Sequence, residues 1–170
     1  MKRILIAVVG HGLHAKKKHL KLAEEVGKEI AKRGGVVLCG GRSEGIMDAV
    51  AKGCKSMNGL VIGILPESDR SKVSKYVNIP IITGMGFARN QILALSCDAM
   101  IVIGGGVGTL TEMAYAYAYS KPIIVLKGTG GLSEKFVGKY MDEKRRIRVR
   151  SAKNARSAVE LAFKLSKVKG

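Results

Sequence analysis

A glycine-rich segment followed by a carboxylate is the part of this sequence whose residue types point most directly to chemistry. Residues 104–109 read GGGVGT, follow an apolar run and precede a segment of helical periodicity. Glycine backbone N–H groups and the positive end of a helix dipole bind phosphate without requiring a lysine. The segment lacks the G-K-[ST] ending of a Walker A loop. Judged locally, Thr109-Leu110-Thr111-Glu112 also fits a capping box, in which Glu112 only satisfies the backbone of Thr109.

Two other glycine-rich turns follow apolar runs. The first fits G-x-G-x-x-[GA] and comprises Gly10, Gly12 and Ala15. The second comprises Gly40, Gly41 and Arg42. An ordinary tight turn and a ligand-facing loop are equal alternatives for the first of them. A dinucleotide site would need an acidic residue about 20 positions later to bind a ribose. Cys39 and the second turn stand there instead, which excludes a conventional NAD site.

These turns lie between short apolar runs that alternate with segments of helical periodicity. The alternation predicts an α/β fold, a doubly wound Rossmann-like parallel sheet with helices on both faces. The expected strands are Arg3–Val9, Val36–Cys39, Leu60–Leu65, Ile79–Thr83, Ala99–Ile103, Pro122–Leu126 and Ile147–Arg150. A length of 170 residues without a visible linker indicates a single nucleotide-binding domain over residues 1–170.

Composition excludes several classes of protein. With 46% hydrophobic and 25% charged residues, the chain is globular rather than disordered. No apolar run approaches the roughly 20 residues that cross a bilayer, so we expect no membrane partner. Three cysteines without a C-x-x-C pair argue against a disulfide framework and a zinc site, which favours a cytoplasmic location.

Much of the net charge of +17 lies in the last part of the chain, because residues 127–170 carry 13 Lys and Arg against 4 Asp and Glu. The segment Lys144–Arg150 alternates basic and apolar residues. As a strand it would place Arg146, Arg148 and Arg150 on one side. Nucleic-acid binding is the natural alternative, but aromatic residues are only 5% and no stacking motif accompanies the charge. We therefore expect a solvated basic face.

The histidines and tyrosines also have structural interpretations. The chain has three histidines, His11, His14 and His19. Because they lack helical i, i+4 spacing and an acidic neighbour, we expect solvated loop side chains and no metal site, with stacking of His11 on a base as the alternative. The tyrosines of residues 115–119 alternate with alanine, but the segment is expected to be helical. Tyr115 and Tyr119 would then share a face that packs on a neighbouring helix or a second subunit.

Residues at fixed distances before the glycine-rich segment strengthen its functional interpretation. Arg89 opens a predicted helix, Asp98 follows nine positions later, and GGGVGT with Glu112 comes after the next apolar run. This arrangement resembles the Lonely-guy family of phosphoribohydrolases, whose signature is an Arg-Lys pair, an Asp and P-G-G-x-G-T-x-x-E. Residues 37–50 and 61–66 are also similar to that family. The likeness extends over residues 4–126 and leaves out a basic strand and helix in 127–170.

The chain departs from the hydrolase pattern at several positions. Gly104 stands where the family has proline, Asn90 where it has lysine, and Thr111 where it has the first of two glutamates. Arg42 also lies outside the hydrolase pattern. These features look more like a prokaryotic branch that is similar to the molybdenum-cofactor carrier proteins, which bind a phosphorylated pterin without a known reaction.

The resemblance to the hydrolases implies cleavage of the N-glycosidic bond of a nucleoside 5′-monophosphate, without a cofactor. Glu112 would stabilise an oxocarbenium-like transition state and orient the attacking water, while Arg89 would bind the phosphate or the ribose hydroxyls. The nucleotide and its phosphate would contact Gly10, Gly12, Gly40, Gly41, Arg42, Gly105, Gly106, Gly108 and Thr109. Asp98 precedes its strand, so we expect it at the opposite edge of the sheet, in a salt bridge or a cap.

The resemblance to the carrier branch implies a different activity for the same residues. In that case the protein binds a nucleotide or the molybdenum cofactor and does not react with it. Under both interpretations the partner is a phosphorylated small molecule. Since related enzymes form dimers, a homodimer or a higher homo-oligomer is expected.

Overall fold

The structure, a computed structural model, describes residues 3–166. Its centre is a seven-stranded sheet in the order β4-β3-β2-β1-β5-β6-β7, in which every neighbouring pair is parallel. The strands are β1 (Leu5–Gly10), β2 (Val36–Cys39), β3 (Leu60–Leu65), β4 (Ile79–Ile82), β5 (Ala99–Ile103), β6 (Ile123–Leu126) and β7 (Arg150–Ala152). The predicted doubly wound α/β fold is confirmed.

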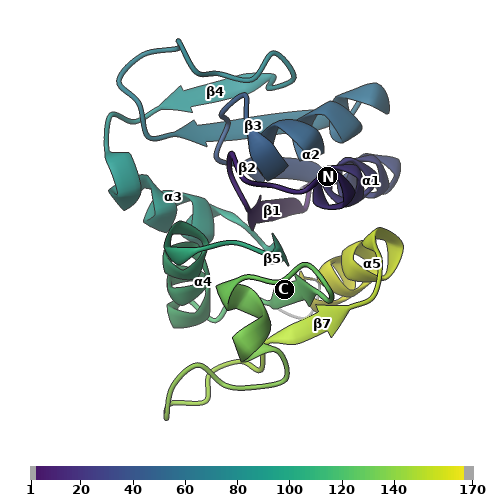
Figure 1. Cartoon of the computed structure of the whole chain (residues 1–170), viewed down its shortest axis with the longest axis vertical. Coiled ribbons are helices and arrows are strands. Elements are labelled where there is room, and N and C mark those ends of the chain that lie inside the picture. Colours follow the sequence, from purple (N-terminus) through teal and green to yellow (C-terminus); the bar gives the residue numbers. More distant parts are fainter. Residues whose placement is uncertain (1–2, 167–170) are drawn as a thin grey trace.

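Helices cover both faces of the sheet (Figure 1). One face carries α1 (Lys17–Lys32), α2 (Gly45–Ser56) and α5 (Ala155–Ser166). The other carries α3 (Arg89–Ser96) and α4 (Val107–Ala118). Two short 3₁₀ helices, η1 (Gly86–Ala88) and η2 (Leu132–Phe136), lie in the connections.

The alternation of side chains along β1 explains why both faces need a cover. Ile6 and Val8 belong to the core under α1, α2 and α5, whereas Ala7 and Val9 belong to the core under α3 and α4. Strands buried on both faces must be apolar throughout, and β5 is fully buried from end to end. The continuous apolar runs of the sequence are therefore the inner strands of the sheet.

The strand order creates one place where a ligand can enter between strands. The chain winds outward from β1 in both directions, through β2 on one side and β5 on the other. At such a switch point the connections leave in opposite directions and a crevice opens at the carboxyl ends of the strands. Gly10, at the end of β1, pairs with Ile103 at the end of β5. A Cβ at Gly10 would collide with the carbonyl of Ile103, so only glycine allows this close approach.

One predicted element is displaced. The last strand is Arg150–Ala152, not Ile147–Arg150, and its pairing with β6 begins at Arg150. The residues before it cannot join the sheet because Val149 exchanges backbone hydrogen bonds with Gly138 and Lys139. The prediction that Arg146, Arg148 and Arg150 share one face of a strand is therefore wrong.

We predict that Gly10→Ala lowers the free energy of unfolding by about 1–3 kcal/mol, because the methyl group must push β1 and β5 apart. Gly12→Ala is the matched control, since its Cβ would meet nothing closer than 3.8 Å. Denaturant unfolding of the two variants measures the difference. Equal stabilities would contradict the assignment of a tight β1–β5 contact.

Candidate functional site

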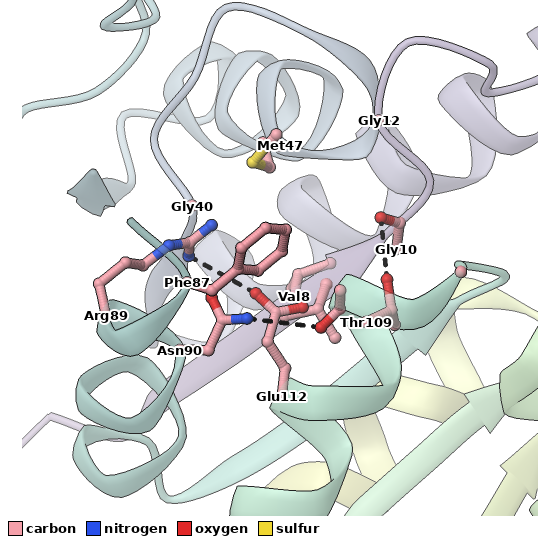
Figure 2. A pocket seen from close by; sticks show the side chains of 13 residues that line it. Val8, Gly10, Gly12, Gly40, Met47, Phe87, Arg89, Asn90, Thr109 and Glu112 are labelled. Atoms are coloured by element: carbon pink, nitrogen blue, oxygen red, sulfur yellow. Dashed lines mark hydrogen bonds and ion pairs between the residues drawn. The ribbon is translucent and has the colours of Figure 1, made fainter. Parts of the chain in front are cut away.

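A crevice of about 210 Å³ lies at the switch point of the sheet (Figure 2). The end of β1, the end of β2 and the first turns of α3 and α4 enclose it. Its lining consists of Val8, Val9, Gly10, Gly12, Gly40, Met47, Phe87, Arg89, Asn90, Gly106, Gly108, Thr109 and Glu112. Residues that are far apart in the sequence thus meet at one edge of the sheet, as the motif spacing predicted.

A buried arginine and a buried carboxylate face each other in this crevice. Nη1 of Arg89, the first residue of α3, lies 3.5 Å from Oε1 of Glu112 in α4. The two residues are only 8% and 7% exposed. Burial raises the pKa of Glu112 to about 7, although the nearby Arg89 acts to lower it. Near neutral pH this carboxyl group can therefore hold or release a proton.

Arg89 has N–H donors that are available to a ligand. Burial lowers the pKa of Arg89, and Glu112 only partly offsets this effect. Its Nε is buried without a hydrogen-bond partner among the described residues. An orphaned buried donor is costly, whereas a phosphate or hydroxyl oxygen would satisfy it. The guanidinium group also lies over Gly40, where a Cβ would come within 2.9 Å of Nη2.

The capping-box interpretation of Thr109 and Glu112 is wrong. Helix α4 already begins at Val107, with Gly106 as its N-cap and no side-chain capping bond. The Thr109 hydroxyl donates to the carbonyl oxygen of Gly10 at 3.2 Å, while Glu112 points toward Arg89. Thr109 therefore fastens the first turn of α4 to the end of β1. The first N–H groups of a helix lack intrahelical acceptors, so this turn can bind an anion.

The glycine loop before α4 has a backbone that other residues would strain. Gly104 has φ +63° and Gly105 has φ +105°. A Cβ at Gly104 would also collide with the ring of His11. Proline fixes φ near −65°, so it cannot occupy position 104 in this conformation. The glycine that replaces the family proline is thus required by the loop and by its neighbour His11.

Thr129, for which the sequence predicted no role, holds this loop through its side-chain hydroxyl. The backbone N–H of Gly104 donates to the Thr129 hydroxyl at 2.9 Å, and that hydroxyl donates to the carbonyl of Leu126 at 2.6 Å. Leu132 donates its backbone N–H to the carbonyl of Gly105. Residues 127–131 read KGTGG, and this glycine-rich composition after a strand was the available signal.

Two further departures from the hydrolase pattern, Asn90 and Thr111, contact each other. Asn90 donates through Nδ2 to the hydroxyl of Thr111 at 2.8 Å, and that hydroxyl donates to the carbonyl of Gly108 at 2.7 Å. This neutral pair joins α3 to α4 one residue away from Arg89. It thereby sets the position of Arg89 relative to Glu112.

Most of the predicted site residues meet in the crevice, but three do not line it. Gly41 packs toward Leu65, and the carbonyl of Gly105 accepts the backbone N–H of Leu132. Arg42 lies in a smaller adjoining cavity, where its Nε donates to Glu67 at 2.7 Å. Five lining residues lie outside the predicted site, namely Val8, Val9, Met47, Phe87 and Asn90. For Phe87 the available signal was an aromatic residue two positions before Arg89.

The prediction of solvated histidines is wrong for His19. It lies in α1, is only 4% exposed and stacks on His11 with ring centroids 5.6 Å apart. Burial lowers the pKa of His19, and both its ring nitrogens lack partners among residues 3–166. In that part of the chain no group of three or more His, Cys, Asp or Glu side chains could hold a metal ion.

Asp98 and the tyrosine segment both lie outside the crevice. Asp98 accepts the backbone N–H of Leu5 at 2.8 Å, at the edge of the sheet opposite the crevice. The tyrosine segment is helical up to Ala118, as predicted, and Tyr119 is the C-cap of α4. Tyr119 accepts a hydrogen bond from Gln91 of α3, and Tyr117 donates to Asp142.

Comparison with known proteins shows which proteins this chain resembles. A sequence model of the SLOG cluster4 family matches residues 3–159. The cytokinin riboside 5′-monophosphate phosphoribohydrolase of Mycobacterium tuberculosis is 34% identical over 119 residues, which cover 65% of this chain and 64% of that protein. The chain therefore spans less than two thirds of the length of this curated relative.

Solved structures match over nearly the whole chain. The molybdenum cofactor binding protein of Rippkaea orientalis has a TM-score of 0.87 and 38% identity, covering 97% of this chain and 98% of that one. The molybdenum cofactor carrier protein of Chlamydomonas reinhardtii has a TM-score of 0.85 and 36% identity, covering 96% and 98%. Among the described residues no helix is long and apolar enough to cross a membrane.

We predict that Thr129→Val lowers the free energy of unfolding by about 1–3 kcal/mol, because it leaves the buried N–H of Gly104 without its acceptor. Thr129→Ser keeps the hydroxyl, so its free energy of unfolding should fall much less. Thermal or denaturant unfolding of both variants tests this. If the serine variant were as unstable as the valine variant, lost packing rather than the lost hydrogen bond would be the cause.

Proposed function

The chain belongs to the SLOG cluster4 family, and on this premise we propose that it hydrolyses a nucleoside 5′-monophosphate to a free base and ribose 5-phosphate. The observation that carries the proposal is the buried carboxyl group of Glu112, which faces Arg89 next to an anion-binding helix start. Two relatives named cytokinin riboside 5′-monophosphate phosphoribohydrolase, at 34% and 30% identity, support the same reaction class.

In this proposal the first turn of α4 binds the 5′-phosphate. Gly106, Gly108 and Thr109 line the crevice there, and the absence of side chains on the two glycines lets the phosphate approach the backbone. Gly10 and Gly12 also line the crevice, and the Gly10 carbonyl accepts the hydroxyl of Thr109 from this turn. Arg89 donates its free N–H groups to the phosphate or to the ribose hydroxyls, using a planar fork that a lysine lacks.

Glu112 acts at the anomeric carbon. As the bond from C1′ to the base nitrogen breaks, its electron pair leaves with the base and positive charge develops on the ribose. The Glu112 carboxylate stabilises that charge and accepts a proton from the water that attacks C1′. The departing base takes up a proton from solvent. The reaction needs no metal and no cofactor.

A direct test is the release of ribose 5-phosphate from a panel of purine and pyrimidine monophosphates. We expect Glu112→Gln to lower kcat at least about 100-fold, because the amide cannot stabilise the developing charge or accept the proton. Glu25→Gln, an exposed substitution in α1, is the matched control and should retain full activity. No release from any nucleotide by the unaltered protein would contradict the proposal.

The raised pKa of Glu112 predicts the pH dependence of the reaction. The active form is the carboxylate, so activity is lost as the pH falls through about 7, where the buried group takes up its proton. kcat/KM should therefore rise with pH up to about 7 and then level off. A profile that stays flat down to pH 5 would exclude Glu112 as the proton acceptor.

A second candidate function is the binding of molybdenum cofactor without reaction. The observation that favours it is the φ of +63° at Gly104, which a hydrolase-type proline cannot adopt, together with the near full-length match to cofactor-binding proteins. The residues fit the phosphate end of that cofactor, because Arg89 Nε, beside the first turn of α4, has no hydrogen-bond partner within residues 3–166. Bound cofactor would supply the molybdenum centre that a receiving enzyme needs.

Molybdenum content separates the two functions. Under the carrier function, the protein purified from a cofactor-producing host contains molybdenum and pterin in stoichiometric amounts and releases no ribose 5-phosphate from any nucleotide. Under the hydrolase function, it releases ribose 5-phosphate and holds no stoichiometric molybdenum.

A further inference from the structure

Phe87 separates the crevice from a second, smaller cavity. This cavity of about 110 Å³ is lined by Arg42, Pro66, Gly86, Phe87, Arg89 and Asn90, the last three of which also line the crevice. A ligand that fills the crevice can therefore continue past Phe87 into the smaller cavity. Arg89, which lines both cavities, faces Glu112, the residue proposed to act at the anomeric carbon.

The Phe87 ring is placed to stack on a flat ligand. It is 77% exposed although it lines both cavities, so little of the protein covers its faces. One edge is held near Gly108, where a Cβ would lie 3.4 Å from Cε1. In the view of Figure 2 the ring lies between Met47 and the contact of Arg89 with Glu112. An aromatic ring in this position stabilises a bound base by stacking.

Arg42 defines the hydrogen-bonding character of the smaller cavity. Glu67 holds its guanidinium group, because Nε and Nη2 both contact the same carboxylate oxygen, at 2.7 and 2.5 Å. This hydrogen bond also raises the pKa of Arg42, which keeps the group charged. Nη1 has only a 3.5 Å contact with Glu44, and the side chain is 34% exposed. Its free N–H groups can donate to a ligand but cannot accept from one.

We infer that the smaller cavity is a base subsite that selects a 6-oxopurine, the ring of inosine and guanosine monophosphates. The ring stacks on Phe87, and Arg42 donates to O6 and N7, two adjacent acceptors that an arginine fork matches. A 6-aminopurine presents a donor in place of O6, so its amino group would face the donors of Arg42. The inference rests on the proposed function, since it requires the 5′-phosphate to lie at α4.

The subsite predicts a preference that can be measured by calorimetry. The full chain carrying Glu112→Gln is titrated with IMP, AMP and ribose 5-phosphate, so that no nucleotide is consumed. IMP should bind at least about 10-fold more tightly than AMP. Arg42→Lys keeps the charge next to Glu67 but lacks the planar fork, so the ratio of the two affinities should fall to about 1. Ribose 5-phosphate should bind this variant unchanged.

The stacking role is tested in the same way. Phe87→Ala should weaken IMP and AMP equally, by about 5-fold or more, and leave ribose 5-phosphate unaffected. Melting curves of both variants check that they are folded.

Two results would overturn the subsite: equal binding of IMP and AMP, or a preference for IMP that survives in Arg42→Lys. Loss of ribose 5-phosphate binding in Phe87→Ala would show that the ring supports the phosphate site rather than the base. These outcomes differ from a failure of the proposed function, in which ribose 5-phosphate and both nucleotides fail to bind the parent chain.

Discussion

The buried contact between Arg89 and Glu112 is the interaction on which the rest of the site depends. Either charge alone would be costly to bury, and at 3.5 Å the pair satisfies neither partner fully. Burial raises the pKa of the carboxyl group to about 7, and Nε of the guanidinium has no hydrogen-bond partner in the described part of the chain. A site whose buried donors and acceptors are not all paired is unfavourable when empty, and a ligand that pairs with them stabilises it. The fold supplies the constraint that keeps the two residues together, because α3 and α4 pack on the same face of the sheet.

The departures from the hydrolase pattern follow from local contacts. Gly104 is required because the loop has a positive φ and His11 occupies the space of a Cβ. Asn90 and Thr111 replace two charged residues by a hydrogen-bonded neutral pair that still joins α3 to α4. Each change is matched by a neighbour, so the frame around Arg89 and Glu112 is retained. The same frame can therefore serve a hydrolase or a cofactor-binding protein.

The structure could be predicted from the sequence where a local pattern of residues determines it. Short apolar runs bounded by turn residues indicate strands, so six strands were predicted within about two residues, including the edge strand β4. Prediction failed where contacts between residues far apart in the sequence determine the local structure. Glu112 fits a capping box locally but turns to Arg89, and Val149 pairs with the 138–139 turn instead of extending β7. The roles of Thr129 and His19 likewise depend on neighbours that only the folded chain brings close.

The central claim is that one crevice holds the phosphate at α4 and the anomeric carbon at Glu112. A crystal structure with ribose 5-phosphate tests it most directly. We predict phosphate oxygens within hydrogen-bonding distance of the backbone N–H groups of Gly108 and Thr109, with C1′ next to the Glu112 carboxylate. A phosphate bound outside the first turn of α4, or a C1′ directed away from Glu112, would contradict the account.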